Sequence, residues 1–377
     1  MNKRFTKGVV ALVAAVSLLA TACGSDEAAV GSGDCDSVDS VSLQLQWVTQ
    51  AQFAGYYAAV DRGIYEDYCL DVNILEGGVD IVPQQQLVNG AADFAISWVP
   101  KALGSVENGE PIKIVAQVFQ RSGTLQVSWA DAGIGSDPAN LEGKKVGTWG
   151  WGNELELVAG LIRAGVQNPN SAEELIGQSF DMFPLLNREI DAAQAMTYNE
   201  YAMLLEAMNP ATGELYKASD FAVIDWNDHG TAMLQDAIWA RSDKLESDDE
   251  YRDITSRFVE ASLMGWSHCR EDADDCVGIV LDNGSAIGES HQAWMMNEIN
   301  RLIWPSPNGV GMMDSDLWNQ TIQVSLDTGL LAKDPGTSVY TNEFAEKAND
   351  NMAKEAGRAT TGSGWQPKQI TLNPGGE

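Results

Sequence analysis

The sequence predicts an α/β fold of two lobes, each built on a mainly parallel sheet, with two strands crossing between the lobes. The 377 residues exceed one ordinary domain and suit two. Short apolar strands alternate with helical stripes, which is typical of parallel sheets covered by helices on both faces. Two extended stretches, 112–129 and 221–240, flank an inserted βα unit, and we expect them to join the lobes.

The individual elements follow from hydropathy and stop signals. Residues 41–47 alternate with period two and predict a strand. An apolar stripe from Phe53 to Val60 predicts a helix that ends at Gly63. Further strands are expected at 70–75, 94–98, 145–149 and 192–196. Further helices are expected at 83–89, 155–162, 199–208, 254–266, 294–303 and 314–327.

The N-terminal residues 1–22 have the layout of a signal peptide, with basic residues before an apolar run at 9–19. The small residues before Cys23 resemble a bacterial lipobox, in which the cysteine carries a lipid anchor. The alternative is secretion with Cys23 unmodified. The predicted organisation continues with a lipid-anchored tether at 23–40, lobe 1 at 41–125 plus 240–345, lobe 2 at 126–239, and a C-terminal helix end and tail at 346–377.

Cys35, Cys69, Cys269 and Cys276 remain after the lipobox cysteine. An even number in an exported chain predicts two disulfides, although four cysteines allow three connectivities. Closeness in sequence favours Cys269 with Cys276, which leaves Cys35 for Cys69. A metal site formed by His268 with Cys269 and Cys276 is the alternative, but an oxidising compartment argues against it, and we expect no metal.

The composition excludes some partners. With 23 Lys and Arg against 54 Asp and Glu, the net charge is −31, so the surface repels phosphate backbones and no nucleic-acid partner is expected. No second long apolar run follows the signal peptide. The mature protein is therefore expected to be a soluble monomer apart from its lipid.

The run LQWVTQAQFAGYY at 45–57 resembles the opening signature of the NMT1/THI5-like substrate-binding proteins. Similar blocks follow at 62–65, 70–72, 77–78, 89–93, 143–147, 187–191, 195–200, 297–298, 303–305 and 340–343. The resemblance implies the type II periplasmic-binding fold. It also implies an extracytoplasmic solute-binding lipoprotein on the cell membrane, with the permease of an ATP-binding-cassette (ABC) importer as its partner. The family's ligands are thiamine pyrimidine precursors, riboflavin and, more distantly, alkanesulfonates or nitrate.

Ligands of open α/β sheets bind beyond the carboxyl ends of the strands. These points fall at 47–57, 97–98, 149–154, 197–200 and 226–229, and four of the five carry tryptophan. Such crowding predicts a stacking pocket for a planar heterocycle, while the alternative is that each ring packs in a core. The candidate ligand-binding residues are Trp47, Gln52, Phe53, Tyr56, Ser97, Trp98, Trp149, Trp151, Asn153, Glu154, Tyr198, Asn199, Glu200 and Trp226.

The charges at these points bear on the ligand. The five segments contain no Arg or Lys, and only Lys101 is near, whereas a sulfonate, nitrate or phosphate normally requires cationic donors. A neutral heterocycle is therefore favoured, with pyrimidine and flavin both open. Glu154 has an alternative role as a first-turn acid that favours the helix dipole.

One branch of the family is an enzyme that builds the thiamine pyrimidine from its own histidine and pyridoxal phosphate. Its lysine and histidine would lie where this chain has Ser97 and Lys101, and its cysteine-dense motif is absent. The histidines at 229, 268 and 291 show no catalytic or metal-binding spacing. We therefore expect a binding protein without a cofactor, and the synthase-type enzyme is the alternative from another class.

Overall fold

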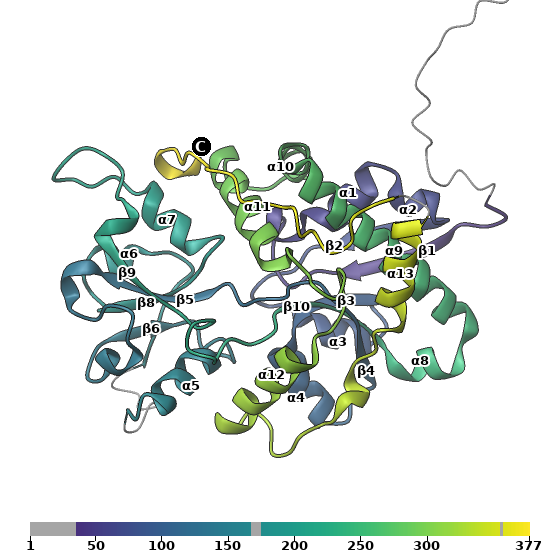
Figure 1. The fold of residues 1–377 in the computed structure, drawn as a ribbon, viewed down its shortest axis with the longest axis horizontal. Helices are drawn as coiled ribbons and strands as arrows, with labels where there is room; N and C mark the ends of the chain where they lie inside the picture. Colours follow the sequence, from purple (N-terminus) through teal and green to yellow (C-terminus); the bar gives the residue numbers. More distant parts are fainter. Residues whose placement is uncertain (1–34, 167–174, 355–356) are drawn as a thin grey trace, which may run out of the picture.

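The computed structural model describes residues 35–166, 175–354 and 357–377. The predicted signal peptide, Cys23 and most of the predicted tether lie outside these residues. Two lobes stand side by side, and the chain crosses between them twice (Figure 1). The expected α/β two-lobe architecture is confirmed.

The sheet of lobe 1 has the strand order β2-β1-β3-β10-β4. β1 pairs in parallel with β2 and β3, whereas β10 pairs antiparallel with β3 and β4. Four strands therefore run in one direction, and the returning strand β10 runs against them. The strands are β1 Asp39–Gln44, β2 Leu70–Leu75, β3 Phe94–Trp98, β4 Ile112–Gln117 and β10 Asp236–Arg241.

The sheet of lobe 2 repeats this plan in the order β7-β6-β8-β5-β9. β6 is parallel to β7 and β8, and the incoming strand β5 is antiparallel to β8 and β9. Each sheet is thus mostly parallel, and its single opposed strand follows a crossing between the lobes. The strands are β5 Thr124–Trp129, β6 Val146–Thr148, β7 Leu175–Gly177, β8 Ala192–Met196 and β9 Phe221–Asp225.

Helices cover both sheets (Figure 1). The helices of lobe 1 and the C-terminal part are α1 Ala54–Asp61, α2 Ile64–Asp67, α3 Pro83–Val88, α4 Val99–Glu107, α8 Ser242–Ser247, α9 Asp249–Glu271, α10 Ala273–Asp282, α11 Glu289–Ile303, α12 Ser315–Asp327 and α13 Glu343–Lys354. Lobe 2 carries α5 Leu155–Arg163, α6 Phe183–Leu186 and α7 Glu200–Glu206. The short 3-10 turns η1 Ala51–Phe53 and η6 Pro374–Gly376 matter below.

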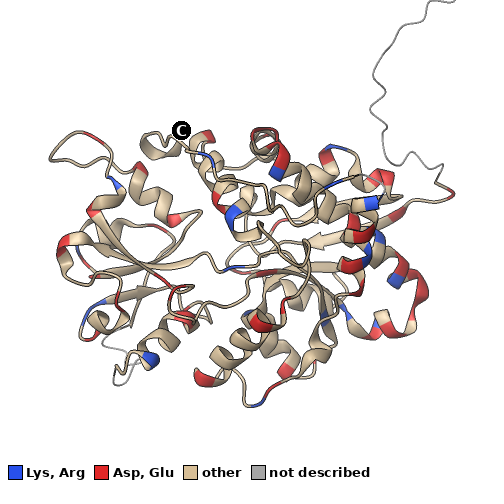
Figure 2. Cartoon of the chain, in the orientation of Figure 1, with Lys and Arg blue, Asp and Glu red and all other residues tan. Residues whose placement is uncertain are grey.

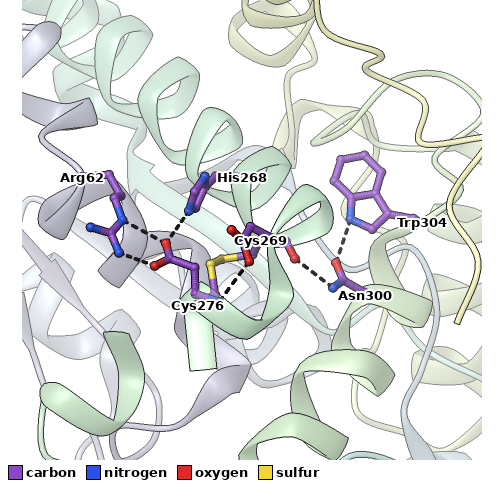
Figure 3. Close-up of a disulfide and its surroundings, with 8 residues drawn as sticks. Arg62, His268, Cys269, Cys276, Asn300 and Trp304 are labelled. Atoms are coloured by element: carbon purple, nitrogen blue, oxygen red, sulfur yellow. Dashed lines mark hydrogen bonds and ion pairs between the residues drawn. A yellow bond between two sulfur atoms is a disulfide. The ribbon is translucent and has the colours of Figure 1, made fainter. Parts of the chain in front are cut away.

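Both predicted disulfides are present, Cys35–Cys69 and Cys269–Cys276. The second joins α9 to α10 and lies in a network of hydrogen bonds (Figure 3). Asn300 of α11 donates to the Cys269 carbonyl at 3.2 Å and accepts from Trp304 Nε1 at 3.0 Å. The alternative metal site is contradicted, because both thiols are oxidised to the disulfide.

Acidic residues are spread over the helices and loops of both lobes, and basic residues are fewer (Figure 2). Within the described residues, no helix is both long enough and apolar enough to cross a membrane.

Candidate functional site

Three aromatic rings connect the two lobes. Trp47 follows β1 in lobe 1, and its ring lies 4.8 Å from that of Phe180, which follows β7 in lobe 2. Phe180 in turn stacks on Trp149 at 6.0 Å and an interplanar angle of 20°. We call these residues (Trp47, Trp149 and Phe180) the aromatic bridge. Both tryptophans are half-buried, and each follows the carboxyl end of a strand, Trp47 after β1 and Trp149 after β6.

The loop that carries Trp47 is held rigidly. The Thr49 backbone N–H donates to the Glu76 carboxylate at 2.7 Å, and the Thr49 and Tyr57 hydroxyls are 2.8 Å apart. Gly77 packs so closely under this loop that any Cβ would collide with the backbone of residues 45–47. A fixed loop positions the Trp47 ring without help from the other lobe.

Polar groups lie beside the aromatic bridge. The buried Asp236 carboxylate, at the start of β10, accepts from Gln52 Nε2 at 2.9 Å and also from Gln46 Nε2. Gln46 accepts from the Trp98 backbone N–H at 3.2 Å. Lys101 Nζ lies 4.8 Å from the centroid of the Trp98 ring. We call Gln46, Gln52, Lys101 and Asp236 the polar floor.

The polar floor contains a lysine, Lys101, and a carboxylate, Asp236, that stabilise each other's charged forms. Burial raises the pKa of Asp236 to about 7, opposed by the hydrogen bond from Gln52 and by the Lys101 charge. Burial lowers the pKa of Lys101 to about 8, opposed by Asp236 and by Glu154 of lobe 2. Lys101, the one cation expected near these strand ends, therefore lies at the site, since α4 begins directly after β3 and brings Lys101 close to Asp236. The cation is matched by carboxylates from both lobes.

The two crossings between the lobes, from β4 to β5 and from β9 to β10, contribute side chains to a second polar network. Glu156 of α5 accepts from Ser122 Oγ at 3.0 Å and from the Met233 backbone N–H at 2.5 Å. Gln235 donates to the Ser122 and Thr124 hydroxyls at 3.1 and 2.8 Å. Burial raises the pKa of Glu156 to about 8. Residues of both crossings are thereby tied to a helix of lobe 2.

A cavity of about 10 Å³, roughly the room for one water molecule, lies between the lobes at this network. Its walls come from both lobes and both crossings. They are Trp98, Pro100, Thr124, Gly152, Asn153, Leu155, Glu156, Met233 and Gln235. The lobes are therefore closed tightly here, and a heterocycle needs them to separate before it can enter.

Three predicted residues after β8 lie at the junction of the lobes. Tyr198 belongs to lobe 2 in sequence, but its side chain is buried in the core cluster of lobe 1. Burial is the main cause of its raised pKa, and the nearby Asp236 raises the pKa further. Asn199 Nδ2 donates to Glu200 at 2.9 Å, and Asn199 Oδ1 accepts from His291 Nε2 of α11 at 3.0 Å. Burial raises the pKa of Glu200 to about 7. Asn199 thus faces α11 rather than the aromatic bridge, and the Glu200 carboxylate accepts from Asn199 and from the Met196 backbone N–H at the end of β8.

Four predicted site residues are buried within the lobes and do not line the junction between them. Trp226 is fully buried in a core cluster of lobe 2, where a Cβ at Gly160 of α5 would collide with its ring. Phe53 and Tyr56 belong to the core of lobe 1, because η1 and α1 turn these rings onto α9 and the sheet. Ser97 is buried, and its carbonyl accepts from Trp239 Nε1 at 3.1 Å. For these four, the alternative of core packing is the better description.

The predicted site residues of the loop 149–154 lie in different surroundings. Trp151 is 95% exposed and has a left-handed backbone with φ of 55°. Asn153 Nδ2 donates to the Gly150 carbonyl at 2.7 Å, and Glu154 accepts from the Gly152 N–H at 2.9 Å. Asn153 and Glu154 therefore shape their own loop, while Glu154 also acts on the charge of Lys101.

Sequence reasoning missed Phe180, Gln46 and Asp236. Phe180 follows a strand of three residues, which is too short to leave a periodic pattern. Asp236 begins an antiparallel strand, so its first residue lies at the edge where the parallel strands end, opposite Trp98. The returning crossing was the signal that could have identified it. Within the described residues, no group of three or more His, Cys, Asp or Glu side chains could hold a metal ion.

Comparison with known proteins gives relatives over most of the chain. The family model described as NMT1/THI5 like matches residues 50–275, more than half of the chain. A formylaminopyrimidine-binding protein of Halalkalibacterium halodurans is 21% identical over 83% of this chain and 91% of its own. The riboflavin-binding protein RibY of Chloroflexus aurantiacus is 22% identical over 82% of this chain and 86% of its own.

Solved structures share the fold. The ligand-binding component of an ABC-type import system from Staphylococcus aureus, solved with zinc bound, superimposes with a TM-score of 0.58 at 13% identity. The match covers 82% of this chain and 99% of that one. The two-lobe architecture is thus that of the periplasmic binding proteins.

Proposed function

This chain belongs to the NMT1/THI5-like family, and from that premise we propose that it is the solute-binding component of an ABC importer and captures a neutral planar heterocycle between its lobes. The observation that carries the proposal is the aromatic bridge, in which Trp47 of one lobe and Trp149 of the other both contact Phe180. Parting the lobes would separate Trp47 from Phe180 and Trp149 and leave flat apolar faces on both lobes for a ligand ring to stack on.

The polar floor supports an uncharged ligand. Lys101 supplies one cation, but Asp236 and Glu154 bring negative charge to it from both lobes. A sulfonate or nitrate would gain from Lys101 and be repelled by the carboxylates, so the site offers an anion little net attraction. A ring with amino and carbonyl edges can instead bond to the amides of Gln46 and Gln52 and to Asp236.

The names of two relatives suggest two neutral planar ligands, a formylaminopyrimidine for one relative and riboflavin for the other. Closure of the lobes on such a ring would exclude water and present a closed form to a permease in the cytoplasmic membrane. In this proposal Cys23 carries the lipid anchor, and the protein acts outside the cytoplasm as a monomer. The lobes divide in the two crossings, between β4 and β5 and between β9 and β10, within a few residues of the boundaries expected from the sequence.

The synthase-type enzyme is the less favoured function. Ser97 is buried in the interior, and two histidines are bonded to carboxylates away from the polar floor, His268 to Asp275 at 2.7 Å and His291 to Glu206 at 3.0 Å. Incubation with pyridoxal phosphate and iron tests this function. Loss of mass from a histidine in the intact protein would favour the enzyme.

Isothermal titration calorimetry tests the binding proposal with four probes: a formylaminopyrimidine, riboflavin, an alkanesulfonate and nitrate. We expect heat with one of the two heterocycles and none with the two anions. The matched variant Trp149→Ala should reduce that heat, whereas Trp151→Ala should leave it unchanged. Tight binding of either anion, with no response to the heterocycles, would overturn the proposal.

A further inference from the structure

A second contact between the lobes lies at α7 and α11 and is centred on a buried histidine. His291 belongs to the first turns of α11 and is 1% exposed. Its Nδ1 lies 3.0 Å from the Glu206 carboxylate of α7. Its Nε2 lies 3.0 Å from Asn199 Oδ1, in the residue that precedes α7. α11 packs in the core of lobe 1 and α7 belongs to lobe 2, so the imidazole joins the lobes directly.

The orientation of Asn199 fixes the protonation state that this geometry needs. Asn199 Nδ2 donates to Glu200 Oε1 at 2.9 Å, which turns its carbonyl oxygen towards His291. Both imidazole nitrogens then face oxygen acceptors, a carboxylate on one side and an amide carbonyl on the other. Only the doubly protonated imidazolium can donate both hydrogen bonds.

The C-terminal segment covers this contact. η6 packs against both α7 and α11, and the C-terminus lies over the junction of the lobes in Figure 1. A Cβ on Gly376 would come within 3.0 Å of His291 Cβ and 3.1 Å of the Glu206 carboxylate. The Asn373 N–H donates to Ser290 Oγ at 3.1 Å, which ties the segment to α11 next to the histidine. Water is thereby kept from the imidazole.

The charged side chain in direct contact with His291 is a carboxylate. Glu206 contacts the imidazole directly at 3.0 Å. Burial raises the pKa of Glu200, and the nearby His291 opposes this rise. Glu377 follows Gly376 on the covering segment. η1, which also packs on α11, carries no titratable side chain. In α10, Asp274 and Asp275 face Lys368 and Arg62 instead.

We propose that His291 is a proton-dependent latch between the lobes: protonated, it donates to Glu206 and Asn199 and holds α7 against α11. Loss of one proton removes one of the two hydrogen bonds, and the remaining acceptor is left buried without its donor. A rise in pH that removes this proton therefore loosens α7 and the C-terminal segment and lets the lobes part. The latch does not depend on which ligand the site between the lobes takes.

The test needs no ligand and uses the whole mature chain. Hydrogen–deuterium exchange, corrected for the intrinsic rate, is followed in α7 and residues 373–377 from about pH 5.5 to about pH 8.5. Small-angle scattering of the same samples reports the separation of the lobes. We expect the protection of α7 to fall about tenfold or more across this range and the radius of gyration to rise.

Variants assign the effect to the latch. His291→Gln keeps one donor but cannot gain a proton, so its α7 protection should not change with pH. Glu206→Gln should flatten the profile in the same way and serves if His291→Gln does not fold. His268→Gln, which alters the other bonded histidine at the α9–α10 disulfide, should behave as the wild type. A flat wild-type profile, or a pH response that persists in His291→Gln and Glu206→Gln, would overturn the proposal.

Discussion

Replacing Trp226 with alanine separates core packing from ligand contact. Trp226 follows β9 at a strand end, yet its side chain is fully buried in lobe 2 against Gly160 of α5. Removing a fully buried indole leaves a cavity that the helix cannot fill by collapse. The expected loss in the free energy of unfolding is about 3–5 kcal/mol.

Urea unfolding followed by circular dichroism measures this loss, and Trp151→Ala is the control. Trp151 is 95% exposed, so its removal should change the free energy of unfolding by no more than about 0.5 kcal/mol. At a temperature where Trp226→Ala stays folded, its ligand affinity should match the wild type. A loss below about 1 kcal/mol, or weakened binding by a stable Trp226→Ala protein, would refute the placement of this ring in the core.

Three further predictions follow from the site and the cross-links. Trp149→Ala should weaken heterocycle binding at least about tenfold by calorimetry, because stacking on an aromatic ring contributes about 1–3 kcal/mol, and unchanged affinity would remove this ring from the site. In the wild type, Glu156 holds its proton when folded but releases it when unfolded between about pH 4.5 and about pH 8, so stability falls as pH rises through that window. Glu156→Gln should make urea midpoints depend less on pH there, and an identical slope would contradict the raised pKa. Replacing Cys35 and Cys69 by serine should lower the free energy of unfolding by about 2–4 kcal/mol, and a change within error would show that this disulfide adds nothing.

The strands and helices were largely predictable because their signals are local. β2, β3 and β8 occupy the predicted residues, since continuous or alternating apolar runs bounded by turns define them. β7 could not be predicted, because three residues carry no period. α4 was also missed, because it begins at Val99 directly after β3 with no turn residues between them.

The candidate site was predictable only in part, because a strand end fixes where a side chain begins and not where it points. Trp47, Trp98 and Trp149 lie at the junction of the lobes, whereas Trp226 turns into its own lobe. What turns it is the absence of a side chain at Gly160, which lies far from it in the sequence. Such pairings depend on tertiary packing and leave no trace in local periodicity.

Native mass spectrometry of the protein purified from its own cells tests the central claim most directly. If the aromatic bridge opens to hold a flat uncharged ring, the protein should carry a non-covalent adduct with the mass of a pyrimidine or a flavin, with a yellow colour in the second case. Trp149→Ala, purified in parallel, should lose the adduct. A co-purified sulfonate or other anion retained by both proteins would contradict the account.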